Sequence, residues 1–282
     1  MLAASSNQQP PVETGGRGLT EVPAVVASDT APLAQTDQDV PREQKGDAPG
    51  GKPPTPAHTG FGALLDGLKG DIGHLPSRQN LYIAGIGGGL ALAVHPFDEA
   101  LNSHIVNNPS DVAQALFAPG KYLGDTPEQV AFSIGTWVLG RVMHKPKMSH
   151  LGMDLLRAQA LTEIMVEPIK FATHRERPDG SNHRSFPSGH AAITFAAATV
   201  IERHLGWKHS IAAYAIASYV AASRLYDNRH YLSDVVFGAA VGSIAGRTVT
   251  AHGRDAWTLG PVAVPGGMAI AATRNYEVRS ER

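Results

Sequence analysis

The stretch HSIAAYAIASYVAASRLYDNRHYLSD, residues 209–234, joins a long apolar segment to a short charged one. In its first half the apolar residues recur at the spacing of an α-helix. Its second half places two arginines, a histidine and two aspartates close together. Charges gathered directly behind such a helix form either a solvated loop or a binding site, and the rest of the sequence is needed to separate these alternatives.

Five further segments share this pattern of apolar residues at helical spacing, with alanine, glycine and serine where one helix could approach another. The six segments together are residues 79–94, 127–143, 150–173, 190–204, 208–223 and 231–250. The sequence therefore predicts an all-α fold built as a bundle of about six helices.

A glycine-rich run, GIGGGLALA at residues 85–93, lies in the first of these segments. It follows no obvious strand and lacks the lysine and serine or threonine that end a P-loop, so a nucleotide phosphate site is not indicated. Gly85 and Gly89 have instead the spacing that lets two helices pack closely. We assign this run to helix packing.

The two ends of the chain differ from the helical part, which we place at residues 61–252. Residues 1–60 contain no aromatic side chain and are rich in proline, glycine and polar residues, which predicts a disordered leader; a processed pro-segment is the alternative. Residues 253–282 form an extension in which Pro265-Gly266-Gly267 favours a small hairpin over a loose tail.

Composition excludes several classes of protein. The net charge of −1 does not require a strongly basic face, so nucleic acid is not an expected partner. The absence of cysteine removes thiol nucleophiles, disulfides and thiolate metal sites. No signal peptide is visible at residues 1–16, and only residues 81–97 approach the roughly 20 uncharged apolar residues of a membrane span. Membrane-embedded and soluble forms both stay open.

Three polar motifs lie at the ends of the predicted helices, and the first is KFATHRERP at residues 170–178. Lys170 and Arg177 are seven residues apart, about two helical turns, so a continuing helix would present both cations on one side. Pro178 discourages helix at the residue before it. A basic helix end that interacts with its own dipole is the simpler alternative.

The second motif is SFPSGHAAITFAAATVI at residues 185–201. It reads as a turn followed by an alanine-rich helix, so the N–H groups of Gly189 and His190 lie at a helix start, where the dipole favours an anion. Ser188 could equally be an ordinary helix N-cap.

The third motif lies in the opening stretch. His230 and Asp234 are four residues apart, so on a helix the carboxylate could accept one N–H of the imidazole and leave the other nitrogen facing outward as a nucleophile or base. Arg224 could fold back toward the same ring. A surface contact between the histidine and the aspartate is the alternative.

Together the three motifs supply what phosphoryl transfer needs: rigid cations and N–H donors around the phosphate oxygens, a nucleophile and an acid. The patterns K-x6-R-P (170–178), P-S-G-H (187–190) and S-R-x5-H-x3-D (223–234) resemble the three signature motifs of the type-2 phosphatidic acid phosphatase and vanadium haloperoxidase superfamily. All signature positions are filled. The resemblance covers residues 170–234 directly, and the flanking helices fit the six-helix core of that family.

The resemblance implies a role for each signature residue. His230 would attack phosphorus to give a phosphohistidine, with Asp234 orienting the ring, and His190 would protonate the leaving oxygen and then activate water. The residues implied to bind the phosphate are Lys170, Arg177, Ser188, Gly189 and Arg224. Members of the family need no metal for this hydrolysis, and we expect no compact cluster of metal-ligating side chains in this chain.

The implied function is that of a bacterial-type acid or lipid phosphatase in a membrane or the periplasm, acting on a lipid phosphate or a small phosphate monoester. The alternatives are a haloperoxidase, in which His230 would hold vanadate as cofactor, and an inactive helical protein that binds membranes. The short spacer at residues 179–186 leaves the substrate open. Five basic residues outside the signature positions are interpreted as a funnel for anions. They are His174, Arg175, His183, Arg184 and Arg229.

Overall fold

The computed structural model describes residues 52–53, 55–251, 257–264 and 267–274. Residues 1–51, most of the predicted disordered leader, lie outside the described part of the chain. All described residues belong to one compact unit, residues 46–282.

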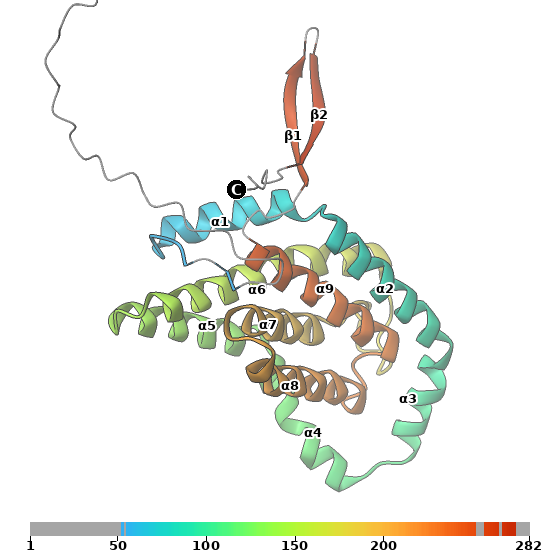
Figure 1. Ribbon diagram of the computed structural model, residues 1–282. Coiled ribbons are helices and arrows are strands. Elements are labelled where there is room, and N and C mark those ends of the chain that lie inside the picture. Colours follow the sequence, from blue (N-terminus) through green and yellow to red (C-terminus); the bar gives the residue numbers. More distant parts are fainter. Residues whose placement is uncertain (1–51, 54, 252–256, 265–266, 275–282) are drawn as a thin grey trace, which may run out of the picture. The chain divides into compact units, whose positions relative to one another are not determined.

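The described residues form nine α-helices, one 3-10 turn and two strands (Figure 1). The helical elements are α1 (Phe61–His74), α2 (Arg78–Val94), the 3-10 turn η1 (His95–Phe97), α3 (Asp98–Asn107), α4 (Asp111–Gly124), α5 (Thr126–Val142), α6 (Pro146–Thr173), α7 (Gly189–Leu205), α8 (Trp207–Tyr226) and α9 (Leu232–Ala251). The predicted all-α class is confirmed, and all six predicted segments are helices: α2 and α5 to α9. The additional helices are α1, α3 and α4.

The strands β1 (Trp257–Val264) and β2 (Gly267–Arg274) pair antiparallel. Trp257 lies opposite Arg274, and Val264 lies opposite Gly267, so the two strands are consecutive arms of a hairpin. Residues 265–266, between the two strands, lie outside the described part of the chain.

Helix α7 lies at the centre of the bundle and packs against α6, α8 and α9 (Figure 1). Its alanine-rich sequence explains this position, because Ala191, Ala192 and Ala196 are fully buried and allow close contact. On α9, a Cβ atom added at Gly242 would collide with the carbonyl of Ala192. The small residues therefore set the distance between the two central helices.

The glycine-rich run does pack against a neighbouring helix, but through a different glycine from the two that were predicted. A Cβ at Gly87 would collide with Ala240 of α9, whereas Gly85 and Gly89 have no neighbouring atom within reach of a Cβ. The contact on α9 decides which face of α2 is buried, and that face carries Gly87.

The outward side of the helices is strongly apolar. On α2, Leu81, Tyr82, Ile86 and Leu92 are each at least 65% exposed. Two helical segments within the described residues have the length and composition of a membrane span: residues 78–107, which are mostly exposed, and α9, which is mostly buried. Only the first combines span-like composition with an apolar outer surface, because α9 belongs to the core.

Candidate active site

The three motifs meet at one end of the bundle, where the last turns of α6 and α8 adjoin the first turns of α7 and α9. The backbone links them: the N–H of Ser188 donates to the carbonyl of Asp234 at 3.0 Å. A Cβ at Gly189 would lie 3.2 Å from the Nζ atom of Lys170. The three motifs are therefore brought together in one site.

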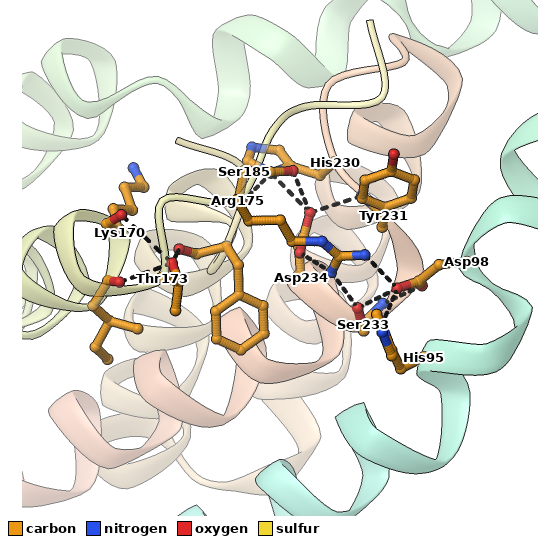
Figure 2. A network of polar contacts seen from close by, with 12 residues as sticks. His95, Asp98, Lys170, Thr173, Arg175, Ser185, His230, Tyr231, Ser233 and Asp234 are labelled. Carbon is orange, nitrogen blue, oxygen red and sulfur yellow. Dashed lines mark hydrogen bonds and ion pairs between the residues drawn. The ribbon is translucent and has the colours of Figure 1, made fainter. Parts of the chain in front are cut away.

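His230 is buried, and a hydrogen bond at Nδ1 fixes the orientation of its ring. Its Nδ1 atom lies 2.7 Å from the carbonyl oxygen of Ser185 (Figure 2). In the neutral ring this bond puts the proton on Nδ1, so Nε2 carries the lone pair that a nucleophile needs. Burial lowers the pKa of His230 from its ordinary value, although the nearby Asp234 acts in the opposite direction. The neutral ring is thus the favoured form of the unliganded site.

Asp234 lies near His230 but does not bond it directly. Its Oδ2 atom is 3.7 Å from His230 Nδ1 and accepts hydrogen bonds from the Ser185 hydroxyl and from the N–H of Tyr231. The predicted proximity of the two side chains is present as this ion pair, but they do not share a helix, because α9 begins only at Leu232, after the histidine. The carboxylate therefore acts on the imidazole through its charge and through Ser185, which the sequence motifs did not single out.

Arg175 has a different position from the one predicted. Instead of lying in a funnel for anions, its guanidinium donates to Asp234 Oδ1 at 2.7 Å and to Asp98 Oδ2 at 2.8 Å (Figure 2). Ser233 connects the same groups, because its hydroxyl accepts from Arg175 and donates to Asp98. Asp98 opens α3, so this network ties that helix to the catalytic end of α9.

Two arginines of the motifs each have a buried N–H group that suits an anion. Among the described residues, the Nε atoms of Arg177 and Arg224 are buried and have no hydrogen-bond partner. A buried donor without an acceptor is costly, and a bound phosphate would remove that cost. Burial and the positive charge of the neighbouring Arg229 lower the pKa of Arg177 from its ordinary value.

Lys170 and Ser188 have protein partners as well as a place in the site. Lys170 Nζ is 3.4 Å from Glu167, and its side chain is largely buried. The Ser188 hydroxyl accepts from the N–H of Ala191 at 3.4 Å, so Ser188 is the N-cap that the simpler interpretation required. The N–H of Gly189 follows at the first position of α7, where no acceptor exists within the helix.

His190 faces a carboxylate that the sequence did not reveal. Its Nε2 atom lies 2.8 Å from Oδ1 of Asp125, the residue before α5. A carboxylate in this position orients the imidazole. Burial and the nearby positive charge of Arg224 lower the pKa of His190 to about 3, so the ring is neutral until the negative charge of a bound phosphate favours its protonation. No motif marks Asp125, because the contact depends on where α4 ends and α5 begins.

The other funnel residues line the loop after α6. The rings of His174 and His183 stack with centroids 4.6 Å apart. Arg184 forms an ion pair with Glu167, and Arg229 forms one with Asp179. These four residues stay within the loop region beside the site.

An all-helical bundle with two histidines and several buried cations at one end is the architecture of a class of phosphate-processing proteins. Residues 151–257 match the model of the PAP2 superfamily. The resemblance drawn from the three motifs is thereby confirmed.

Two curated relatives share part of this region. A lipid A 1-phosphatase from Porphyromonas gingivalis is 44% identical over 90 residues, which are 31% of this chain and 20% of that protein. A PA-phosphatase related-family protein from Dictyostelium discoideum is 25% identical over 137 residues, which are 39% of this chain and 50% of that protein. The chain thus spans half or less of the length of these relatives.

A solved structure shares the fold. It is a transmembrane PAP2 type phosphatidylglycerolphosphate phosphatase from Bacillus subtilis, with a TM-score of 0.51 and 24% identity. The match covers 60% of this chain and 93% of that one. The helical architecture is therefore that of a PAP2 protein.

Proposed function

We propose that the protein is a metal-independent phosphatase that hydrolyses a lipid phosphate through a phosphohistidine on His230. The observation that carries this proposal is the pair of buried, unpartnered Nε atoms of Arg177 and Arg224 beside two catalytic-type histidines. Such an arrangement fits a tetrahedral oxyanion, because arginine can bind two phosphate oxygens at once and keeps its charge.

In the first half of the reaction, Nε2 of His230 attacks phosphorus. The Ser185 carbonyl keeps the Nδ1 proton in place, and Asp234 stabilises the positive charge that develops on the ring. Lys170, Arg177 and Arg224 balance the charge on the phosphate oxygens. His190, oriented by Asp125, gives its proton to the leaving oxygen as the ester bond breaks.

In the second half, neutral His190 takes a proton from a water molecule, and that water attacks the phosphohistidine. The bond between phosphorus and His230 Nε2 breaks, inorganic phosphate leaves, and His190 is again protonated. Each histidine therefore returns to its starting form after one turnover.

A lipid substrate is supported by an apolar groove beside the site. The groove has a volume of about 380 Å³ and runs along α7 from Thr194, one turn beyond His190. Its walls are mainly hydrophobic side chains, among them Leu123, Phe132, Ile201 and Ile216. A small sugar phosphate would leave this surface unused, whereas an acyl chain would cover it.

A lipid substrate implies that the protein works at a membrane. The exposed apolar surface of α2 supports this, because residues 78–107 have the length and composition of a membrane span and are mostly exposed.

The test is phosphate release by the purified full chain in detergent micelles, with excess chelator and a panel of lipid phosphates beside a small phosphate ester. We expect turnover of a lipid phosphate, loss of at least about a thousandfold in His230→Ala, and normal turnover in His209→Ala, an exposed histidine on α8. Vanadate should inhibit, because it fills the same oxyanion site. Persistent turnover in purified His230→Ala would contradict the mechanism.

A further inference from the structure

A second cluster of titratable side chains lies at the end of the bundle remote from the active site. His150 and Asp154 are near the start of α6, and His204 is near the end of α7. Asp154 Oδ2 is 3.1 Å from His150 Nε2 and 2.9 Å from His204 Nε2. The donor atoms lie within 4.8 Å of one another, and all three side chains are largely or fully buried.

This cluster corrects the expectation that the chain has no compact group of metal-ligating residues. The sequence shows only a histidine and an aspartate four residues apart, which is common on helices. The third member comes from a helix that begins more than thirty residues further along and runs back beside α6. Antiparallel packing of α6 and α7 brings it into place.

We propose that His150, Asp154 and His204 form a binding site for one divalent transition-metal ion, with Zn²⁺ as the best fit. Two imidazole nitrogens and one carboxylate oxygen are a donor set that suits Zn²⁺. In a tetrahedral site with bonds of about 2.0 to 2.1 Å, neighbouring donor atoms are about 3.4 Å apart. The separations from Asp154 Oδ2, 3.1 and 2.9 Å, need to widen by a few tenths of an ångström. The donor nitrogens of the two imidazoles, which lie within 4.8 Å of each other, need to adjust to the same spacing.

The groups around the cluster orient the carboxylate for this role. Arg157 Nη1 donates to Asp154 Oδ1 at 2.8 Å, which leaves Oδ2 facing the two imidazoles. The same guanidinium binds both oxygens of Asp71 on α1, at 2.8 and 2.7 Å. Outer-shell contacts of this kind fix the ligands of many metal sites.

The charges of the cluster also favour a cation. Asp71 and Asp154 carry two negative charges, and Arg157 carries one positive charge. If both imidazoles are neutral, the cluster has a net charge of −1. These groups are almost fully buried, so solvent screens that charge poorly. A divalent ion would offset it and would link α6 to α7 and, through Arg157, to α1.

The site has one way to exchange with solvent. The side chain of His204 is 7% exposed, whereas that of His150 is 1% exposed. A fourth ligand, supplied by water, would enter beside His204. Because the cluster lies some twenty residues along α6 from Lys170, the ion would be structural and would take no part in phosphate chemistry.

The experiment uses the full chain in detergent, stripped of metal and then titrated with Zn²⁺ and with Co²⁺ as a spectroscopic probe. We expect one equivalent of bound ion by elemental analysis and a rise in melting temperature with Zn²⁺. His204→Gln should weaken binding by about a hundredfold or more. His209→Gln should bind like the unaltered chain, because His209 is an exposed neighbour on α8.

Equal metal binding in the two variants, or no binding by the unaltered chain, would overturn the proposal in favour of two imidazoles that merely share one carboxylate. If His204→Gln does not fold, X-ray absorption of the Zn²⁺-loaded unaltered chain decides instead. Two imidazole ligands at about 2.0 to 2.1 Å support the site, and their absence rejects it. Both readouts are independent of phosphatase activity.

Discussion

The imidazole of His230 works in a setting where burial and a nearby carboxylate oppose each other. Burial lowers its pKa, and Asp234 at 3.7 Å raises it, with burial the stronger of the two. The neutral, nucleophilic ring therefore persists to lower pH than in a free histidine, whose pKa is near 6.5.

This balance predicts the acidic side of the pH profile. A group with a lowered pKa gains its proton only at lower pH, so the acidic limb of kcat/KM should fall below pH 6.5 once the ionisation of the substrate has been corrected for. Steady-state kinetics from pH 4 to 8 would measure it. An acidic limb clearly above pH 6.5 would mean that Asp234 outweighs burial.

Ser185 is predicted to be a positioning residue, because its carbonyl holds His230 and its hydroxyl holds Asp234. Ser185→Ala removes only the hydroxyl. We expect kcat to fall about tenfold or more, in line with the loss of a hydrogen bond to a charged group, with KM little changed. Ser181→Ala, on the same loop but exposed, is the control. Equal kcat values in the two variants would show that the Asp234 contact is dispensable.

Helix spacing in the bundle depends on individual glycines, and two of them make a matched pair. Gly242→Ala on α9 would drive a methyl group into the carbonyl of Ala192, so we expect a loss of stability of about 1 to 3 kcal/mol. Gly85→Ala on α2 meets no atom and should leave stability unchanged or raise it slightly. Thermal unfolding in one detergent compares them. Similar melting temperatures would refute the close contact.

The helices that the sequence predicted are those with a sustained apolar repeat, and the motifs at their ends located the candidate site. Helices α3 and α4 were not predicted, because α3 is short and α4 is interrupted by Pro119. This omission also hid Asp98 and Asp125, since each carboxylate meets its partner only through the fold. Arg175 was misplaced for the same reason: sequence spacing does not tell which way a loop arginine turns.

The molecule as a whole separates two kinds of polar group along the lengths of α6 and α7. At the catalytic end, two arginines have Nε atoms without an acceptor among the described residues. The remote end has an interlinked set of polar side chains: His150, Asp154, His204, Arg157 and Asp71. Between them the core is alanine, leucine and valine. Each end can therefore be altered by substitution with little direct effect on the other.

The unpartnered guanidinium atoms have a consequence for the end of each catalytic cycle. Inorganic phosphate, the product, presents the same oxygens as the ester from which it came, and it lacks the acyl chains that would draw it away into the bilayer. Arg177 and Arg224 regain their unsatisfied state only when it departs. In a protein that works as proposed, this attraction slows the release of phosphate. Release and bond breaking then together determine the turnover rate.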